Sequence, residues 1–180
     1  HPDEQTDATR IGTALHALAL EPEAFEARYA IRPEGGPRAN SNAYKDWAAE
    51  HVAAGREILT ADEGARIQAM RAALPAAARK LLRQGRPEVT GLWRHESGVL
   101  LRTRPDWLRG DGIVVDVKTT VDARPARWER QARLLGYHVS GALCVDLLAE
   151  LTGERHEYVY LVIGKDAPHV AYLAPLTAED

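Results

Sequence analysis

Two aspartates and a lysine in the stretch RTRPDWLRGDGIVVDVKTT, residues 102–120, have the types and spacing to do chemistry. Asp106 follows a proline, and Asp116 and Lys118 lie two residues apart in an apolar, β-branched run. Side chains alternate across a strand, so Asp116 and Lys118 project from one face while Val117 points to the other. Two carboxylates and a lysine on one face of an apolar sheet are costly to bury unless their charges are compensated.

A divalent cation would compensate the carboxylates. Oxygen ligands at about 2.0–2.1 Å suit Mg²⁺, which keeps several waters and takes one or two carboxylates. Beside such an ion, Lys118 would orient an attacking water or counter the charge that develops on a phosphate. The alternative is a simple Asp–Lys ion pair at a sheet edge, which a bare D-x-K pattern favours. The Pro-Asp pair upstream, across a turn, shifts the balance toward a metal site.

Helices are expected to fill the first half of the chain. Helical spacing of apolar residues, prolines in first turns and a capping box from Thr60 to Glu63 indicate helices over residues 9–20, 21–30, 43–55, 60–74 and 75–85. Residues 31–42 are rich in Gly, Pro and Asn, which is typical of a loop.

Strands are expected to dominate the second half. Residues 88–108 alternate and turn at His95–Gly98, which predicts a β-hairpin, and residues 113–120 predict a central strand. A long helix or helix pair over 124–151, bent near Gly136 or Gly141, precedes two more strands over 156–164 and 169–175. We therefore predict an α+β (α/β-like) domain spanning residues 1–180, with a mixed central sheet flanked by helices. Its helical N-terminal part covers about 7–85, and its catalytic sheet and helices about 87–176.

Composition narrows the function only weakly. A net charge of −3 gives no global argument for nucleic acid binding, although arginines cluster locally. Cys144 is the single cysteine, which favours a reducing, cytoplasmic location. No apolar run approaches the roughly 18 residues of a membrane span, so no membrane partner is expected.

Four segments in order resemble a known family. The stretch RPDWL…IVVDVKTT is similar to the P-D-x(n)-[D/E]-x-K signature of the restriction-endonuclease-like superfamily. Together with IGTALHALALEPEAFEARYA, GVLLRTRPDWL and YHVSGALCVDLL, it resembles the nuclease domain of exonuclease VIII, the RecE type found in prophages. The resemblance runs from about Thr9 to about Pro175. It implies a restriction-endonuclease-like fold.

The resemblance also implies an activity and its partners. The protein would be a Mg²⁺-dependent 5′→3′ exonuclease that acts on double-stranded DNA ends, with Mn²⁺ as a substitute metal. The enzyme would leave 3′ single-stranded tails for recombination, hand them to a single-strand annealing protein, and form a ring-like homo-oligomer.

Carried over residue by residue, the resemblance assigns roles. Asp106 and Asp116 would be metal ligands, with the backbone carbonyl of Val117, and Lys118 would be the catalytic lysine. The remaining candidates are Glu88 as an acidic residue near water and metal, His16 as a metal ligand from the N-terminal helix, and a DNA-binding set of Arg102, Arg104, Arg124, Arg127 and His138. Without the resemblance, His16 is more simply a structural histidine beside an apolar helix face.

Several alternatives stay open at this point. Ser140 stands where the family usually has Gln after Tyr-His-Val, which puts efficiency and substrate preference in doubt. Trp93 or Trp107 could open a duplex end, although core packing is the simpler interpretation. The rival functions are a nuclease of other polarity or structure specificity, a non-catalytic DNA-binding module that keeps the fold, and a hydrolase of small phosphates. The last lacks a Gly-rich phosphate loop.

Overall fold

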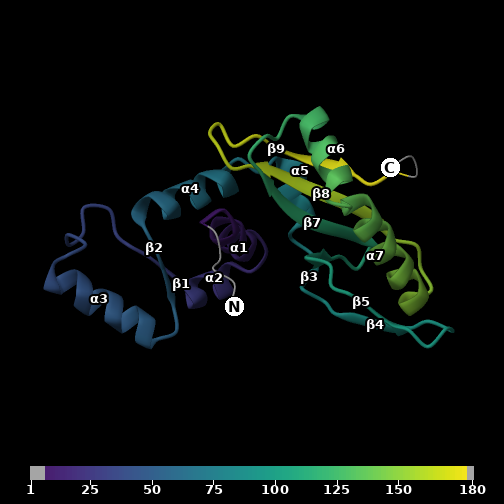
Figure 1. The fold of residues 1–180 in the computed structure, drawn as a ribbon, viewed down its shortest axis with the longest axis horizontal. Helices are drawn as coiled ribbons and strands as arrows, with labels where there is room; N and C mark the ends of the chain where they lie inside the picture. The colour runs from purple at the N-terminus through teal and green to yellow at the C-terminus, as the bar shows by residue number, and fades with distance from the viewer. Residues whose placement is uncertain (1–6, 178–180) are drawn as a thin grey trace. The chain divides into compact units, whose positions relative to one another are not determined.

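The computed structural model describes residues 7–177 and divides into two compact units, residues 1–72 and 73–180. The boundary falls between the helices labelled α4 and α5 in Figure 1. The predicted domain ends at residues 1 and 180 lie outside the described residues. The α+β composition expected from the sequence is present, with helices throughout the chain and a mixed five-stranded sheet in the second unit.

The first unit is mainly helical, as the sequence predicts. Its helices are α1 (Asp7–Leu20), α2 (Pro22–Arg28), α3 (Asn42–Ala53) and α4 (Ala61–Ala72). The apolar face of α1 is buried through Ile11, Ala14, Leu15 and Leu18, and α1 packs on α2 and α4. The capping box forms at α4, where the Glu63 carboxylate accepts the Thr60 N–H at 2.8 Å and the Thr60 hydroxyl accepts the Glu63 N–H at 3.2 Å.

The sequence prediction misses two short strands in this unit. β1 (Tyr29–Ile31) and β2 (Glu57–Leu59) pair in parallel, and the connection between them contains α3. Each strand has three residues, too few to show a period of two. The sequence therefore predicts Tyr29 and Ala30 at the end of the preceding helix, whereas both residues lie in the extended strand β1.

The second unit is organised around a five-stranded sheet in the order β3-β6-β7-β8-β9. The strands are β3 (Arg86–Pro87), β6 (Trp107–Leu108), β7 (Ile113–Thr120), β8 (Glu157–Gly164) and β9 (Ala171–Pro175). β7 and β8 are parallel, and the other pairs are antiparallel. β7 is central, as predicted, and its valines Val114, Val115 and Val117 are buried although they alternate between the two faces of the strand.

The predicted hairpin forms, but as a separate sheet. β4 (Gly91–Arg94) and β5 (Leu100–Thr103) pair antiparallel around the turn at His95–Gly98 and pack on α7. β6, which the sequence assigned to the end of this hairpin, pairs instead with β7. The Trp107 indole is buried and donates to the Leu81 carbonyl at 3.1 Å, so the packing interpretation of this tryptophan is confirmed.

Three helices complete the second unit: α5 (Ala76–Leu81), α6 (Pro125–Leu134) and α7 (Tyr137–Thr152). α6 and α7 form the predicted bent pair, with an angle of 72° and with Gly136 in the left-handed region at φ +67°. They bury a core with one face of β7 and β8, made of Val114, Trp128, Cys144, Leu148, Tyr158, Tyr160 and Val162. Among the described residues, no single helix is long and apolar enough to cross a membrane.

Candidate active site

Asp116 and Lys118 project from the helix-covered face of β7, two and four residues after buried Val114. Asp116 is only 8% exposed. Its Oδ2 pairs with the Lys118 ammonium, and its Oδ1 accepts the Tyr158 hydroxyl at 3.0 Å. The Lys118 ammonium also lies 5.1 Å from the centre of the Tyr137 ring. The two residues are therefore fixed as one buried unit on the central strand.

Asp106 reaches the Asp116–Lys118 pair because β6 is short. The ladder pairs Trp107 with Val115, and β6 begins at Trp107, so the edge of β7 beyond Val115 lacks a strand partner on that side. Asp106 occupies this edge, and its Oδ2 accepts the Val117 N–H at 2.7 Å. The N–H and C=O of one strand residue point to the same side, so the Val117 carbonyl faces Asp106 as well.

Glu88 completes the acidic group within the second unit. It directly follows β3, and its N–H donates to the Asp106 carbonyl at 3.1 Å. One carboxylate oxygen of Glu88 and one of Asp106 lie within 4.8 Å of each other. Glu88 also has a φ of +51°, a left-handed conformation that costs a non-glycine residue about 1–3 kcal/mol. Strain at a carboxylate that faces a second carboxylate is typical of a functional position.

The electrostatics of the pair follow from burial. Burial raises the pKa of the Asp116 carboxyl, and the negative charge of Asp106 raises it further, against lowering by Lys118 and Tyr158. Burial alone would lower the pKa of Lys118, but Asp116 and, more weakly, Asp106 outweigh it, so that pKa is raised. Lys118 is consequently a cation at neutral pH, and the carboxylates repel one another.

These residues fit a hard divalent cation. Three carboxylates and a backbone carbonyl supply oxygen donors only, the donor type that Mg²⁺ prefers. Burial and then the charge of Asp106 raise the pKa of Asp116, and a cation would relieve the repulsion between the two carboxylates. The arrangement can therefore bind a metal ion beside a permanently charged lysine, a combination suited to hydrolysis of a phosphate ester.

Two histidines are also among the predicted site residues. His16 is half-buried on α1 of the first unit, and its role as a metal ligand stays a prediction. His138 is half-buried at the start of α7, and Ser140 is exposed in the same turn. Neither is among the residues that contact Asp116 or Lys118 in the interactions described above.

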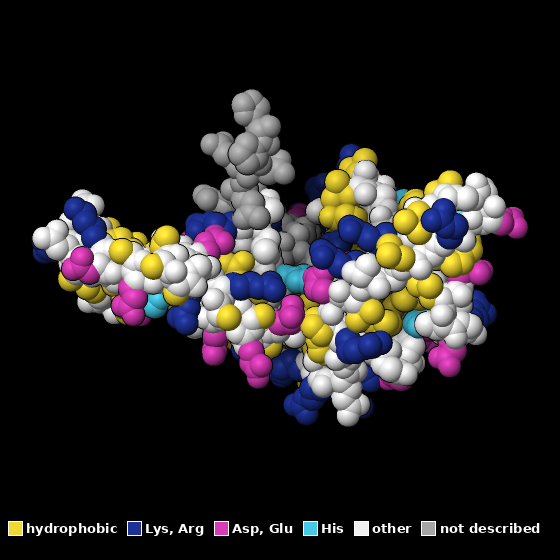
Figure 2. All heavy atoms as spheres, turned by 90° about the horizontal axis from the view of Figure 1, so that it is seen from below, with side chains coloured by type: hydrophobic (Ala, Val, Ile, Leu, Met, Phe, Trp, Pro, Cys, Tyr) yellow, Lys and Arg dark blue, Asp and Glu magenta, His cyan; other side chains and the backbone are white. Residues whose placement is uncertain are grey.

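The predicted DNA-binding arginines are all exposed, and three of them are paired with carboxylates. Arg102 lies on β5, and the Arg104 Nε pairs with Glu88 at 2.9 Å. Arg124 and Arg127, at the start of α6, both pair with Asp122, and the Arg124 guanidinium lowers the pKa of that carboxyl to about 2. Figure 2 shows Lys and Arg side chains in separate groups over the second unit, among apolar and acidic ones.

Two tyrosines at the site were missed by the sequence prediction. Tyr158 holds Asp116 from the neighbouring strand, and Tyr137 lies under Lys118 from the first turn of α7. In the sequence, Tyr158 is one apolar residue of an alternating strand, and nothing distinguishes it from Tyr160. The β7–β8 register and the α6–α7 bend decide that one hydroxyl meets a carboxylate and one ring meets an ammonium.

Replacing Tyr158 by Phe should weaken metal binding without removing a metal ligand. Loss of the hydroxyl leaves Asp116 Oδ1 without this donor, so the pKa of Asp116 rises and proton competition increases. We expect about a 10–100-fold rise in the Mg²⁺ concentration needed for half-maximal activity. Tyr160→Phe is the matched control, because this equally buried hydroxyl donates to the Tyr137 carbonyl at 2.5 Å. An equal loss in both variants would assign the effect to core packing.

The chain matches one protein family and is similar to a solved structure. Residues 1–178 match the family described as a PDDEXK-like domain of unknown function (DUF3799). Among solved structures, the chain is similar to the crystal structure of a "putative exonuclease" from Eubacterium rectale, with a TM-score of 0.61 and 16% sequence identity. The similarity covers 99% of this chain and 62% of that one, so the chain spans less than two thirds of its structural relative. No curated protein sequence matches.

The predicted superfamily and fold class are confirmed by these matches, whereas the likeness to exonuclease VIII stays a prediction. The short D-x-K pattern alone would not have separated a nuclease from an incidental ion pair. The spatial grouping of Asp106, Asp116 and Lys118, together with a match to a PDDEXK-like domain over nearly the whole sequence, favours a family site over an incidental ion pair. The chain belongs to the family of PDDEXK-like domains.

Proposed function

We propose that this domain is a metal-dependent exodeoxyribonuclease that hydrolyses phosphodiester bonds from double-stranded DNA ends. The observation that carries the proposal is the placement of Asp106 at the open edge of β7, beside the buried Asp116–Lys118 pair. Glu88 adds a third carboxylate to the same place. Membership of the PDDEXK-like family and the fold similarity to a structure named as an exonuclease support the reaction class.

In this proposal Mg²⁺ would be held by Asp106, Asp116 and the Val117 carbonyl. When bound, it would lower the pKa of a water molecule and stabilise the leaving oxygen. Lys118 supplies a fixed positive charge, because its raised pKa keeps it protonated at neutral pH. It therefore donates hydrogen bonds to the attacking water or to a phosphate oxygen, and it does not remove a proton. Tyr158 and Tyr137 restrict the motion of Asp116 and Lys118.

The finer parts of the proposal rest on the resemblance to exonuclease VIII. They are 5′→3′ polarity, 3′ single-stranded tails for recombination, and transfer of those tails to a single-strand annealing protein. The same resemblance supports His16 as a further metal ligand, Mn²⁺ as a substitute metal, a ring-like homo-oligomer and a prophage origin. A cytoplasmic location is proposed from the single cysteine, Cys144. Arg102, Arg104, Arg124, Arg127 and His138 are proposed to contact the DNA backbone.

The experiment that tests the proposal is digestion of a linear duplex labelled separately at its 5′ and 3′ ends. It is run with Mg²⁺, with Mn²⁺ and with EDTA. We expect early release of the 5′ label as mononucleotide with either metal and none with EDTA. Early release of the 3′ label would overturn the polarity, and cleavage only at forks or flaps would indicate a structure-specific nuclease. Binding without metal-dependent cleavage would identify a DNA-binding module.

Replacing Arg102 by Gln should weaken DNA binding equally for all sequences. Arg102 is exposed on the strand that leads directly into Asp106, so its guanidinium can meet a phosphate of a DNA strand held there. One lost phosphate contact should reduce the magnitude of the slope of the log DNA-binding constant against log salt concentration by about 1. The control is Arg155→Gln, which makes the same charge change at an exposed arginine in the α7–β8 connection and should leave the slope unchanged. Equal slopes for both variants would contradict a phosphate contact at Arg102.

A further inference from the structure

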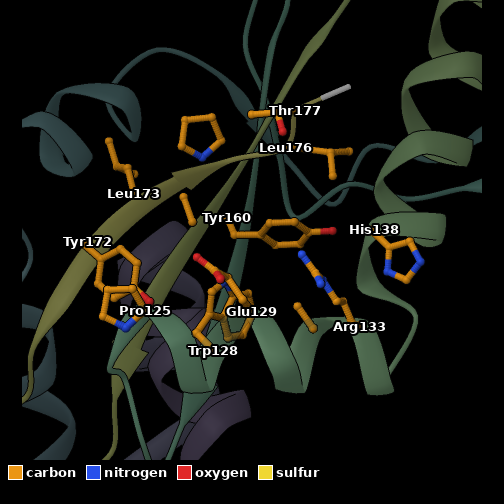
Figure 3. A pocket seen from close by; sticks show the side chains of 13 residues that line it. Pro125, Trp128, Glu129, Arg133, His138, Tyr160, Tyr172, Leu173, Leu176 and Thr177 are labelled. Carbon is orange, nitrogen blue, oxygen red and sulfur yellow. The ribbon is translucent and has the colours of Figure 1, made fainter. Parts of the chain in front are cut away.

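A pocket of about 400 Å³ lies in the second unit between α6, the start of α7 and the edge strand β9. Figure 3 shows its lining side chains: α6 contributes Trp128, Glu129 and Arg133, α7 contributes His138, and the strands contribute Tyr160 and Tyr172. Its volume falls in the range of small-molecule sites, roughly 300–1,000 Å³. The proposed hydrolysis assigns no role to this pocket, apart from a DNA contact proposed for His138.

The floor of the pocket is aromatic and rigid. Trp128 and Tyr160 are 3% and 5% exposed, and their rings meet edge to face with centroids 5.6 Å apart. The Tyr160 hydroxyl donates to the Tyr137 carbonyl at 2.5 Å, which fixes that ring. Tyr172 adds a third aromatic ring from β9. Fixed rings of this kind favour a flat, aromatic ligand because they lose little entropy on binding.

Two polar atoms of the lining have no hydrogen-bond partner among the described residues. They are Nδ1 of His138 and the hydroxyl oxygen of Tyr172, both shielded from solvent. Buried polar atoms are nearly always satisfied, and an unsatisfied one costs about 1–3 kcal/mol. Two such atoms in the lining of one pocket indicate that a bound molecule supplies the partners, after a small rotation of either side chain.

The basic and acidic side chains of the pocket lie toward opposite ends of it. Glu129 and Arg133 are four residues apart on α6, yet no ion pair joins them within the described part of the chain. Figure 3 shows Arg133 and His138 toward α7, and Glu129 and Tyr172 toward the opposite side. The Glu129 carboxylate acts on the Tyr172 phenol, whose pKa is raised by burial and then by that charge. The pocket therefore offers cationic donors at one end and an acceptor at the other.

We propose that this pocket binds a nucleoside 5′-monophosphate whose base carries N–H donors, such as dGMP. The base lies against the partly exposed ring of Tyr172, with Trp128 and Tyr160 as its buried support, and donates to Glu129. The phosphate meets Arg133 and His138. Guanine presents two adjacent donors, N1–H and the 2-amino group, to one carboxylate, whereas thymine presents a single N–H between two carbonyl oxygens. The choice of a mononucleotide, the product class of an exonuclease, rests on the proposed function. The pocket itself does not depend on cleavage.

The test is isothermal titration of the full chain in EDTA with dGMP, dTMP and deoxyguanosine. We expect saturable 1:1 binding of dGMP. Binding of dTMP should be at least about tenfold weaker because its base cannot donate the paired hydrogen bonds to Glu129, and binding of deoxyguanosine at least about tenfold weaker because it lacks the phosphate. Arg133→Gln should weaken dGMP about tenfold and leave deoxyguanosine unchanged. Arg130→Gln, an exposed arginine of the same helix outside the pocket lining, should leave dGMP unchanged.

Tyr172→Phe provides a second, independent readout. It removes a hydroxyl that lacks a partner, so the melting temperature of the metal-free protein should stay the same or rise. The dGMP affinity should fall several-fold at the same time. No saturation by dGMP at millimolar concentration would overturn the proposal, as would equal losses in the Arg130 and Arg133 variants. Because no metal is present, loss of dGMP binding is distinguishable from an absence of nuclease activity.

Discussion

Replacing Lys118 by Met should lower the rate of DNA cleavage by about 10²–10³-fold while DNA binding is retained. The expectation follows from the raised pKa of Lys118, which makes the side chain a fixed cation and a hydrogen-bond donor at neutral pH. Its loss removes stabilisation of developing negative charge and leaves the carboxylates in place. Single-turnover digestion with saturating enzyme measures the chemical step, and Lys45→Met, an exposed lysine of α3, is the control.

The same substitution should change stability in a pH-dependent way. In EDTA, Lys118→Met leaves the Asp116 carboxylate, 8% exposed, without its ion-pair partner, which should cost about 1–3 kcal/mol of unfolding free energy near pH 7. The pKa of folded Asp116 is already above its ordinary value and rises further in the variant. Between the unfolded and folded pKa values the folded state binds more protons, so lowering the pH stabilises it.

The difference in stability between the variant and the natural sequence should therefore shrink as the pH falls through the pKa of Asp116. Urea denaturation at several pH values measures it. Lys118→Arg keeps the charge and should keep most of the stability, with partial cleavage. A variant that cleaves normally, or a stability difference independent of pH, would contradict the role assigned to the Asp116–Lys118 pair.

Replacing Asp106 by Asn should abolish the rise in melting temperature that Mg²⁺ or Mn²⁺ causes, with little effect on the fold. The amide oxygen of Asn can still accept the Val117 N–H, so the interaction at 2.7 Å is preserved while the charge is lost. The loss of Mg²⁺ affinity should exceed the roughly 10–100-fold that loss of an outer-shell partner costs. Removal of repulsion should also lower the pKa of Asp116.

Thermal unfolding with increasing Mg²⁺ or Mn²⁺ reports the metal affinity directly, because a ligand that binds only the folded state raises the melting temperature. The natural sequence should show this rise, EDTA should reverse it, and Asp106→Asn should show none. Asp146→Asn makes the same change at an exposed position of α7 and should behave as the natural sequence does. A metal-dependent rise that persists in Asp106→Asn would remove Asp106 from the ligand set.

The local sequence determined the regular elements that carry their own signals. The run 113–120 is rich in β-branched residues and flanked by Gly112, which favours a strand, and alternation places Asp116 and Lys118 on one face. The Thr60–Glu63 box determined where α4 begins, and the glycines at 136 and 141 marked two places for a bend, of which the structure uses Gly136. These predictions succeed because each depends on residues close together in the chain.

Only the tertiary structure decided which residues meet at the site. β6 begins only at Trp107, where its pairing with Val115 of β7 starts, and this leaves the edge of β7 beyond Val115 open to Asp106. The pairing of β3 with β6 then brings Glu88 to Asp106, and the pairing of β7 with β8 brings Tyr158 to Asp116. The pocket beside α6 depends on the edge strand β9, more than 35 residues after the start of that helix. Strand order and register are set by contacts between distant segments, so the sequence alone named the aspartates and the lysine, and the assembled sheet determined their partners.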